Sequence, residues 1–144
     1  MKFNFKEIYI GECIRKRVED TGISMVRICN FHQATEDEID TMYKQKSMDT
    51  EVLLRWCKLL EYDFFRIYCQ HLILFSPENK SDTLEPIKGT SLPEFRKKLY
   101  TRQVIDFILE LINTRQKTKL QIIEEYRIPK TTLYKWISKY SEME

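Results

Sequence analysis

Hydroxyl, amine and phenol side chains gather near the end of the chain, in the segment TKLQIIEEYRIPKTTLYKWISKY (residues 118–140). In a helix from about Lys130 to Tyr140, successive side chains are turned by about 100°, so the apolar ones share a face: Leu133, Trp136, Ile137 and Tyr140. The opposite face carries Thr131, Lys135 and Ser138, with Tyr134 on its flank. Such groups donate hydrogen bonds to phosphate oxygens and base edges. We therefore expect contacts with double-stranded DNA from Lys130, Thr131, Thr132, Tyr134, Lys135, Ser138, Lys119 and Arg127.

Residue types that carry catalysis or bind metals lack the spacing that this chemistry needs. Three isolated glycines exclude a glycine-rich phosphate loop, and His32 and His71 have no ligand spacing with any cysteine or carboxylate. The four cysteines form no C-x-x-C pair, and without a secretory signal they are expected to be reduced and mostly buried: Cys13, Cys29, Cys57 and Cys69. No nucleophile stands with a recognisable base. The sequence predicts no enzyme, no metal and no cofactor.

The elements that would position the C-terminal segment can be drawn from caps and periodicity. Thr118 and Gln121 have the spacing of a capping box, and Pro129 forces Ile128 out of helical geometry before the last helix. A long helix is expected over residues 95–113, apolar nearly all round, so it must be covered by its own domain or by another copy of the chain.

The sequence IPKTTLYKWI resembles the recognition-helix segment of the homeodomain-like helix-turn-helix found in transposases, recombinases and related regulators. The resemblance covers roughly residues 95–140, and the family's core positions match at Ile122, Ile123, Ile128, Leu133 and Trp136. Arg127 departs from the pattern, because the family usually has Gly or Asn at that turn. The resemblance implies DNA binding; the alternative is a plain helical hairpin with solvated Lys and Thr side chains.

Five short helices are expected before the linker. Residues 9–20 form an amphipathic helix stopped by Gly22, and Ser24 caps a second helix with apolar contacts from Val26, Ile28, Cys29 and Phe31. Thr35 and Glu38 open a third helix as a capping box. Asp49 and Asp63 cap the fourth and fifth helices, the latter with Phe64, Phe65, Tyr68 and Leu72 as its apolar residues.

This arrangement resembles the five-helix Cro/phage-repressor class over about residues 8–72, with TEDEIDTMYKQK at the recognition position. That helix opens with carboxylates, which repel a phosphate backbone: Glu36, Asp37, Glu38 and Asp40. Lys44, Gln45 and Lys46 are candidates for a second DNA contact. The alternative is a dimerisation or partner-binding domain.

Charge and composition divide the chain into two helical domains, residues 1–75 and 94–144, joined by a Pro- and Ser-containing linker at residues 76–93. Residues 1–76 carry 11 Lys/Arg against 12 Asp/Glu, and residues 93–140 carry 11 against 5. The C-terminal part is thus expected to meet a polyanion. Candidates for contacts with flanking phosphates are Arg96, Lys97, Lys98, Arg102, Arg115 and Lys117, with solvated surface charge as the alternative for each.

The scarcity of Gly and Pro and the lack of alternating apolar residues predict an all-α fold. No signal sequence or membrane span is expected, which indicates a soluble, cytoplasmic protein. A homodimer is expected, through either the apolar run Phe64–Phe75 or the helix at 95–113. Together these features predict a sequence-specific DNA-binding protein, either a transcription regulator or a transposase-type accessory protein without a catalytic domain. The alternative is a protein-interaction module with weak, nonspecific nucleic-acid affinity.

Overall fold

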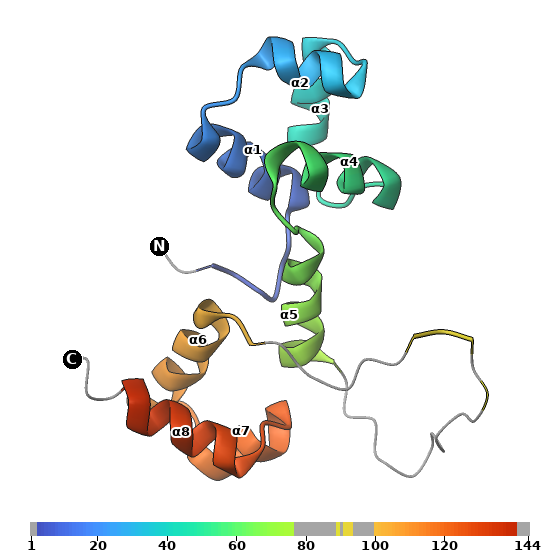
Figure 1. The fold of residues 1–144 in the computed structure, drawn as a ribbon. Coiled ribbons are helices and arrows are strands. Elements are labelled where there is room, and N and C mark those ends of the chain that lie inside the picture. Colours follow the sequence, from blue (N-terminus) through green and yellow to red (C-terminus); the bar gives the residue numbers. More distant parts are fainter. Residues whose placement is uncertain (1–2, 77–88, 90, 94–99, 141–144) are drawn as a thin grey trace. The chain divides into compact units, whose positions relative to one another are not determined.

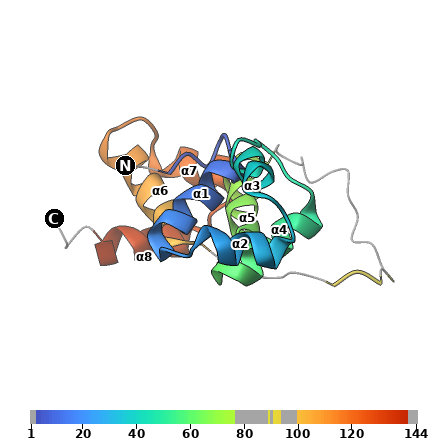
Figure 2. The ribbon, with the colours of Figure 1, turned by 90° about the horizontal axis from the view of Figure 1, so that it is seen from above.

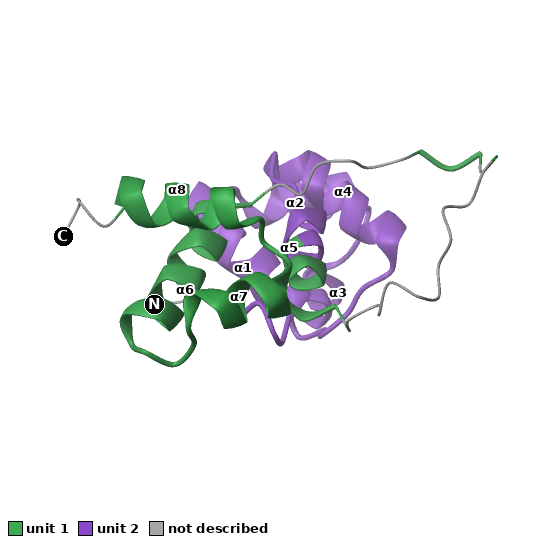
Figure 3. Ribbon diagram, turned by 90° about the horizontal axis from the view of Figure 1, so that it is seen from below, with its two compact units in different colours: residues 1–3, 70–144 green, residues 4–69 purple. Residues whose placement is uncertain are grey.

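The computed structural model of the protein describes residues 3–76, 89, 91–93 and 100–140. These residues form eight helices and no strand, which confirms the expected all-α class (Figure 1). None of the described helices has the length and apolar character that crossing a membrane would require. The chain divides into two compact units, residues 4–69 and residues 1–3 with 70–144 (Figure 3). Most of the expected linker at 76–93 lies outside the described residues.

The unit formed by residues 4–69 is built from four helices and the start of a fifth: α1 (Ile10–Thr21), α2 (Met25–His32), α3 (Glu36–Tyr43), α4 (Thr50–Leu60) and α5 (Phe65–Phe75). Helix α1 packs against α3 and α4, and α2 packs against the same two helices. Their apolar faces meet in one core that contains Ile10, Ile14, Ile28, Ile39, Leu53, Trp56, Leu60, Phe64 and Ile67.

The expected helix boundaries of this unit are confirmed by its caps. Ser24 accepts from the Arg27 amide at 3.3 Å, and the Asp49 carboxylate accepts from the Glu51 amide at 2.8 Å. Helix α3 has both halves of its capping box, because Thr35 Oγ1 accepts from the Glu38 amide and the Glu38 carboxylate accepts from the Thr35 amide. Each bond satisfies an amide that the helix itself leaves unpaired.

Helix α1 begins against the loop that follows α3, at a close approach that requires glycine. The amides of Ile10 and Gly11 donate to the carbonyls of Lys46 and Gln45 at 3.1 and 3.0 Å. A Cβ atom on Gly11 would lie only 2.5–2.7 Å from three backbone carbonyl oxygens of the 42–45 segment. The absence of a side chain at Gly11 therefore fixes how closely α1 and α3 pack.

Two residues of α2 that were expected to make apolar contacts are exposed instead. Val26 is 68% exposed and Phe31 is 44% exposed. Helix α2 has only eight residues, and its core-facing stripe is occupied by Ile28 and His32, one turn apart. Leu72 in α5, which belongs to the apolar run expected to form a homodimer surface, is 61% exposed. All four cysteines are unpaired; Cys13, Cys29 and Cys57 are half-buried, and the expectation of mostly buried cysteines is wrong for Cys69, which is exposed.

The unit that ends the chain contains three complete helices: α6 (Arg102–Asn113), α7 (Lys119–Tyr126) and α8 (Lys130–Tyr140). Helix α8 packs on both α6 and α7, and the three helices can be followed in Figure 2. The buried apolar residues of these helices and their connections are Val104, Ile105, Ile108, Leu111, Ile122, Tyr126, Ile128, Leu133 and Trp136.

Helix α6 is shorter than the expected helix at 95–113. It begins at Arg102 because Thr101 adopts an extended conformation and its hydroxyl caps the Val104 amide at 3.3 Å. Residues 94–99 lie outside the described residues. The chain itself buries one side of α6 through Val104, Ile105, Ile108 and Leu111, and half-buries Phe107, Leu109 and Ile112. Most of the apolar surface of α6 is therefore buried by residues of the same chain.

Candidate nucleic-acid interface

The connection between α7 and α8 is a turn of three residues, Arg127, Ile128 and Pro129. Arg127 ends α7 in the left-handed conformation, with φ 53° and ψ 38°. This is the position at which the resembled family has Gly or Asn, so the arginine adopts backbone angles that glycine adopts without strain. Ile128 is buried, and the Pro129 carbonyl accepts from the Leu133 amide at 3.0 Å. The turn is therefore stabilised both by the core and by a hydrogen bond to the first turn of α8.

Helix α8 is anchored by its apolar side. Leu133 and Trp136 are buried, and the Trp136 ring meets the Tyr100 ring edge-on, with centroids 5.0 Å apart. Ile137 and Tyr140 are half-buried on the same side. Because these contacts fix the rotation of α8 about its own axis, they also decide which side chains point to solvent.

The residues expected to contact DNA lie on the solvent side of this motif, with one exception. The exposed ones are Lys119, Arg127, Lys130, Thr131, Tyr134, Lys135 and Ser138. Thr132 is half-buried, because it precedes the buried Leu133 and lies at the border of the apolar side. Thr132 is therefore the least accessible of the expected contact residues.

A cluster of one phenol and two ammonium groups lies at the start of both helices of the motif. The Lys119 Nζ atom is 5.3 Å from the centroid of the Tyr134 ring, and the Lys130 Nζ atom is 5.7 Å from it. Lys119 is the first residue of α7 and Lys130 the first of α8. These distances are within the range of cation–π attraction, so the ring holds two positive charges near the N-terminal ends of two helices.

The electrostatic character of α7 and α8 follows from where their carboxylates lie. Both carboxylates of this segment, Glu124 and Glu125, are in α7, and the sequence of α8 contains none. Glu125 is paired with Lys117, and this hydrogen bond raises the pKa of the Lys117 amine. The exposed side of α8 therefore presents positive and neutral donors only.

Two of the residues expected to contact flanking phosphates interact with other side chains of the protein. The Arg102 guanidinium lies 3.8 Å from the centroid of the Tyr140 ring and its Nε donates to Asp106 at 3.0 Å. Lys117 is held by Glu125 and lies 5.1 Å from the Tyr126 centroid. Arg115 is exposed, whereas Arg96, Lys97 and Lys98 lie outside the described residues.

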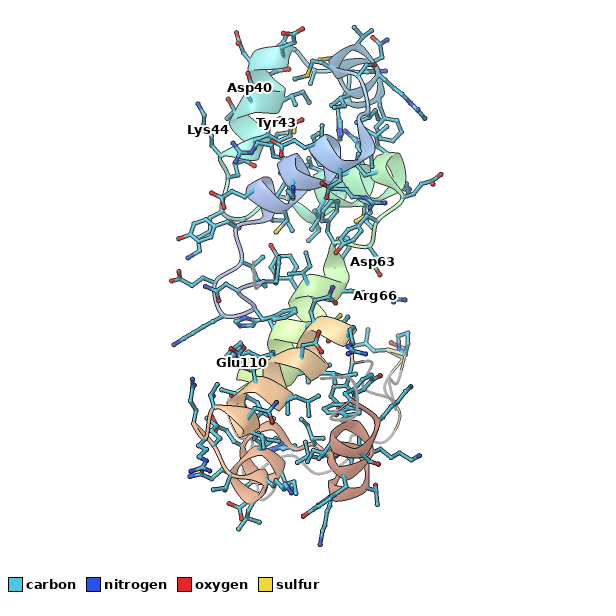
Figure 4. All side chains as sticks on the ribbon, turned by 90° about the vertical axis from the view of Figure 1, so that its left-hand side faces the viewer. Asp40, Tyr43, Lys44, Asp63, Arg66 and Glu110 are labelled. Atoms are coloured by element: carbon cyan, nitrogen blue, oxygen red, sulfur yellow. The ribbon has the colours of Figure 1, made fainter. Side chains whose placement is uncertain are left out.

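The second candidate surface, on α3, has a different chemistry. Glu36, Asp37 and Asp40 are exposed, whereas the Glu38 carboxylate is used in the capping box. Carboxylates at a helix N-terminus complement the macrodipole, which is a structural reason for their presence. Figure 4 shows Asp40 and Lys44, which are four residues apart at the exposed edge of α3.

The three candidate residues after α3 are exposed, but part of this loop is also used to dock α1. The backbone carbonyls of Gln45 and Lys46 accept from α1, and the Lys46 ammonium lies 5.2 Å from the centroid of the Tyr9 ring. Lys44 ends α3 as its C-cap residue. These three side chains therefore follow the C-terminal end of a helix that carries four carboxylates, whereas α8 carries none.

A buried polar–aromatic group in the same unit was not anticipated from the sequence. The His32 ring lies against the Trp56 ring with centroids 4.2 Å apart, and the centroids of the Tyr43 and Trp56 rings are 6.0 Å apart. Burial, with a smaller effect of Arg55, lowers the pKa of His32, and burial raises the pKa of the Tyr43 phenol. His32 is thus a core residue of α2, and among the described residues no group of His, Cys, Asp and Glu is arranged to hold a metal ion.

Comparison of the chain with protein-family models, with curated proteins and with solved structures found no match.

Proposed function

We propose that this protein binds double-stranded DNA in a sequence-specific manner, with α8 as the helix that enters the major groove. The observation that carries the proposal is that α8 is anchored through Leu133 and Trp136 while its opposite side exposes hydroxyl, phenol and amine groups and no carboxylate. A helix that is packed on the core through one side can enter a groove with its other side, and the packing contacts of its apolar residues stay intact.

We further propose that α7, the three-residue turn and α8 form a helix-turn-helix of the homeodomain-like kind. Three features support this assignment: α7 begins with the Thr118–Gln121 capping box, the turn opens with a left-handed residue, and Ile128 is buried within it. The first residues of α8, Lys130 and Thr131, then lie where such helices contact base edges and phosphates. The biological role that fits is transcription regulation, or accessory DNA binding in transposition.

For the unit formed by residues 4–69 we propose a partner-binding role. The exposed carboxylates of α3 favour this role. In a repressor-like domain this helix would face DNA, where its carboxylates would be repelled by the phosphates. Exposed Val26 and Phe31 on the neighbouring α2 give this unit apolar surface for such a contact. We propose a homodimer acting in the cytoplasm, where unpaired thiols stay reduced.

The DNA-binding proposal is tested by measuring the affinity of the full chain for a duplex as a function of salt concentration. Each phosphate neutralised contributes roughly −0.9 to the slope of log affinity against log salt, so a slope of several units is expected. The triple variant Thr131→Ala/Tyr134→Ala/Lys135→Ala should abolish binding while circular dichroism shows an unchanged fold, because all three side chains are exposed.

A matched control is Lys58→Ala, which removes one exposed lysine from α4 in the other unit. This variant should retain the affinity and salt slope of the parent chain. Absence of binding to any duplex at low salt, or equal loss of affinity in the control, would refute the proposal. Light scattering of the same samples measures the molar mass and so tests the proposed homodimer independently of DNA binding.

A further inference from the structure

One residue of the exposed side of α8 differs from the others in how it is held. Tyr134 is 44% exposed, yet its ring has an ammonium group from Lys119 at 5.3 Å and another from Lys130 at 5.7 Å. These two lysines come from two different helices. The phenol is therefore restrained by contacts with side chains from both helices of the motif while its surface remains accessible.

The three side chains of this cluster differ in what they can recognise. A lysine ammonium is a donor only, on a flexible stem, and it binds any phosphate oxygen in its reach as a point charge. A phenol hydroxyl both donates and accepts, so it can match either the acceptors or the amino groups that base pairs present in the major groove. Because side chains from both helices restrain its ring, the Tyr134 hydroxyl can be held toward one base edge, whereas a flexible ammonium accommodates any acceptor in its reach. Tyr134 is therefore the member of the cluster best suited to distinguish one base pair from another.

The alternatives on the same side of α8 are less well suited to this task. Thr131 and Ser138 also carry hydroxyl groups, but on short side chains that extend little beyond the helix backbone. Lys135 is long, but it is a donor on a flexible stem. A tyrosine side chain has only two rotatable bonds to its ring, so ordering it on binding costs little entropy.

We infer that Tyr134 is a specificity-determining residue, whose hydroxyl group reads one base pair of the DNA site while Lys119 and Lys130 hold the neighbouring phosphates. This inference rests on the proposed function, since it assigns separate tasks to residues of the same surface. It divides the cluster into one group that sets the preferred sequence and two that contribute affinity for any sequence.

The test begins with selection of bound sequences from a pool of random duplexes by the full chain. The same selection is then made with Tyr134→Phe, which removes only the hydroxyl group and retains the ring that the two lysines contact. Affinities for the selected duplex and its single base-pair variants are measured by titration. Tyr134→Phe is expected to lose the preference at one base pair, which should be worth about 5- to 150-fold in the parent chain, and to keep every other preference.

Tyr140 supplies the matched control at the other end of the same helix. Its ring also has two cations near it, Arg102 at 3.8 Å and Lys139 at 5.3 Å, so Tyr140→Phe makes the same chemical change in a similar setting. This variant is expected to select the parent sequence. Lys119→Gln and Lys130→Gln should each lower the salt slope by about 0.9 and leave the selected sequence unchanged.

The inference is overturned if Tyr134→Phe selects the parent sequence with unchanged preferences, or if it weakens binding to all duplexes equally. Either result leaves the proposed function intact, because the parent chain still selects a site. If the parent chain selects no sequence, both the inference and sequence-specific binding fail. If it binds no duplex at all, DNA binding itself fails.

Discussion

The backbone amide of Gly11 donates to the carbonyl of Gln45 at 3.0 Å, and a methyl group at Gly11 would lie 2.7 Å from that same oxygen. The carbonyl oxygens of Met42 and Tyr43 would be closer still, at 2.5 Å. All three atoms belong to the backbone, so they cannot turn aside as a flexible side chain would. The close packing of α1 against the end of α3 therefore depends on the absence of a side chain at Gly11.

Gly11→Ala is expected to destabilise the unit formed by residues 4–69. In an ordinary helix interior, alanine is more stable than glycine by about 0.5–1 kcal/mol, but here overpacking against fixed atoms costs more, about 1–3 kcal/mol. We expect a net loss of about 1–2 kcal/mol in the free energy of unfolding, measured by urea titration with circular dichroism. Glu12→Ala, at the exposed neighbouring position, should change it by no more than about 0.5 kcal/mol. A more stable Gly11→Ala variant would show that α1 can move away from this loop.

Arg127→Gly is expected to stabilise the turn between α7 and α8. A left-handed conformation costs a residue with a side chain about 1–2 kcal/mol, whereas the added freedom of glycine in the unfolded chain costs about 0.4–1 kcal/mol. The difference predicts a gain of roughly 0.5–1 kcal/mol, measured by thermal unfolding. Gln33→Gly makes the same change in the turn between α2 and α3, where φ is 51°, and should have the same sign. A loss of stability in both variants would mean that the native backbone carries no such strain.

The stability of the unit containing His32 is expected to fall as the pH is lowered below about 6.5. Burial lowers the pKa of His32 in the folded state, so between the folded and unfolded pKa values the unfolded chain binds more protons. Its contribution to stability is complete above the unfolded value near 6.5 and is lost as the pH falls through the folded value. Urea unfolding at several pH values between 8 and 5.5, followed by tryptophan fluorescence, measures this slope.

His32→Phe should flatten the pH dependence in that window, because it removes the titrating group and keeps an aromatic ring against Trp56. His71→Gln removes the other histidine of the chain and should leave the slope in place. An unchanged slope in His32→Phe would assign the pH dependence to other groups.

Gln70→Leu is expected to weaken the start of α6. The Gln70 side chain is almost fully buried, and its amide oxygen accepts from the Thr101 amide at 3.1 Å, just before the helix. A leucine keeps much of the volume but leaves the Thr101 amide without this partner, a loss of about 1–3 kcal/mol. Hydrogen exchange of the α6 amides should become faster, whereas the exposed Gln103→Leu should not change it. Equal protection in both variants would contradict a supporting role for Gln70.

Local signals in the sequence were sufficient for most helix boundaries. The capping boxes at Thr35 and Thr118 join residues three positions apart, so their geometry depends on the local sequence alone. The orientation of α8 was predictable for a similar reason, because the apolar spacing of Leu133 and Trp136 determines which side is buried. These features need no knowledge of the rest of the chain.

Features that join distant parts of the chain were not predictable in this way. The contact of Gly11 with the carbonyl of Gln45 and the bond from Thr101 to Gln70 each bridge more than thirty residues. The burial of His32 depends on Trp56 from another helix, and no periodicity in α2 distinguishes it from the exposed Phe31. Tertiary packing determines these contacts, and no short pattern in a single sequence reveals which distant residues will pack together.

The turns before α3 and α8 are alike in their backbones, each with three residues and a left-handed residue first, Gln33 and Arg127. The helices that follow them are opposite in ionic character: α3 carries four carboxylates, and α8 carries lysines and none. An anion-exchange resin and a cation-exchange resin should therefore each retain this chain, through different helices, at a pH where its net charge is close to zero.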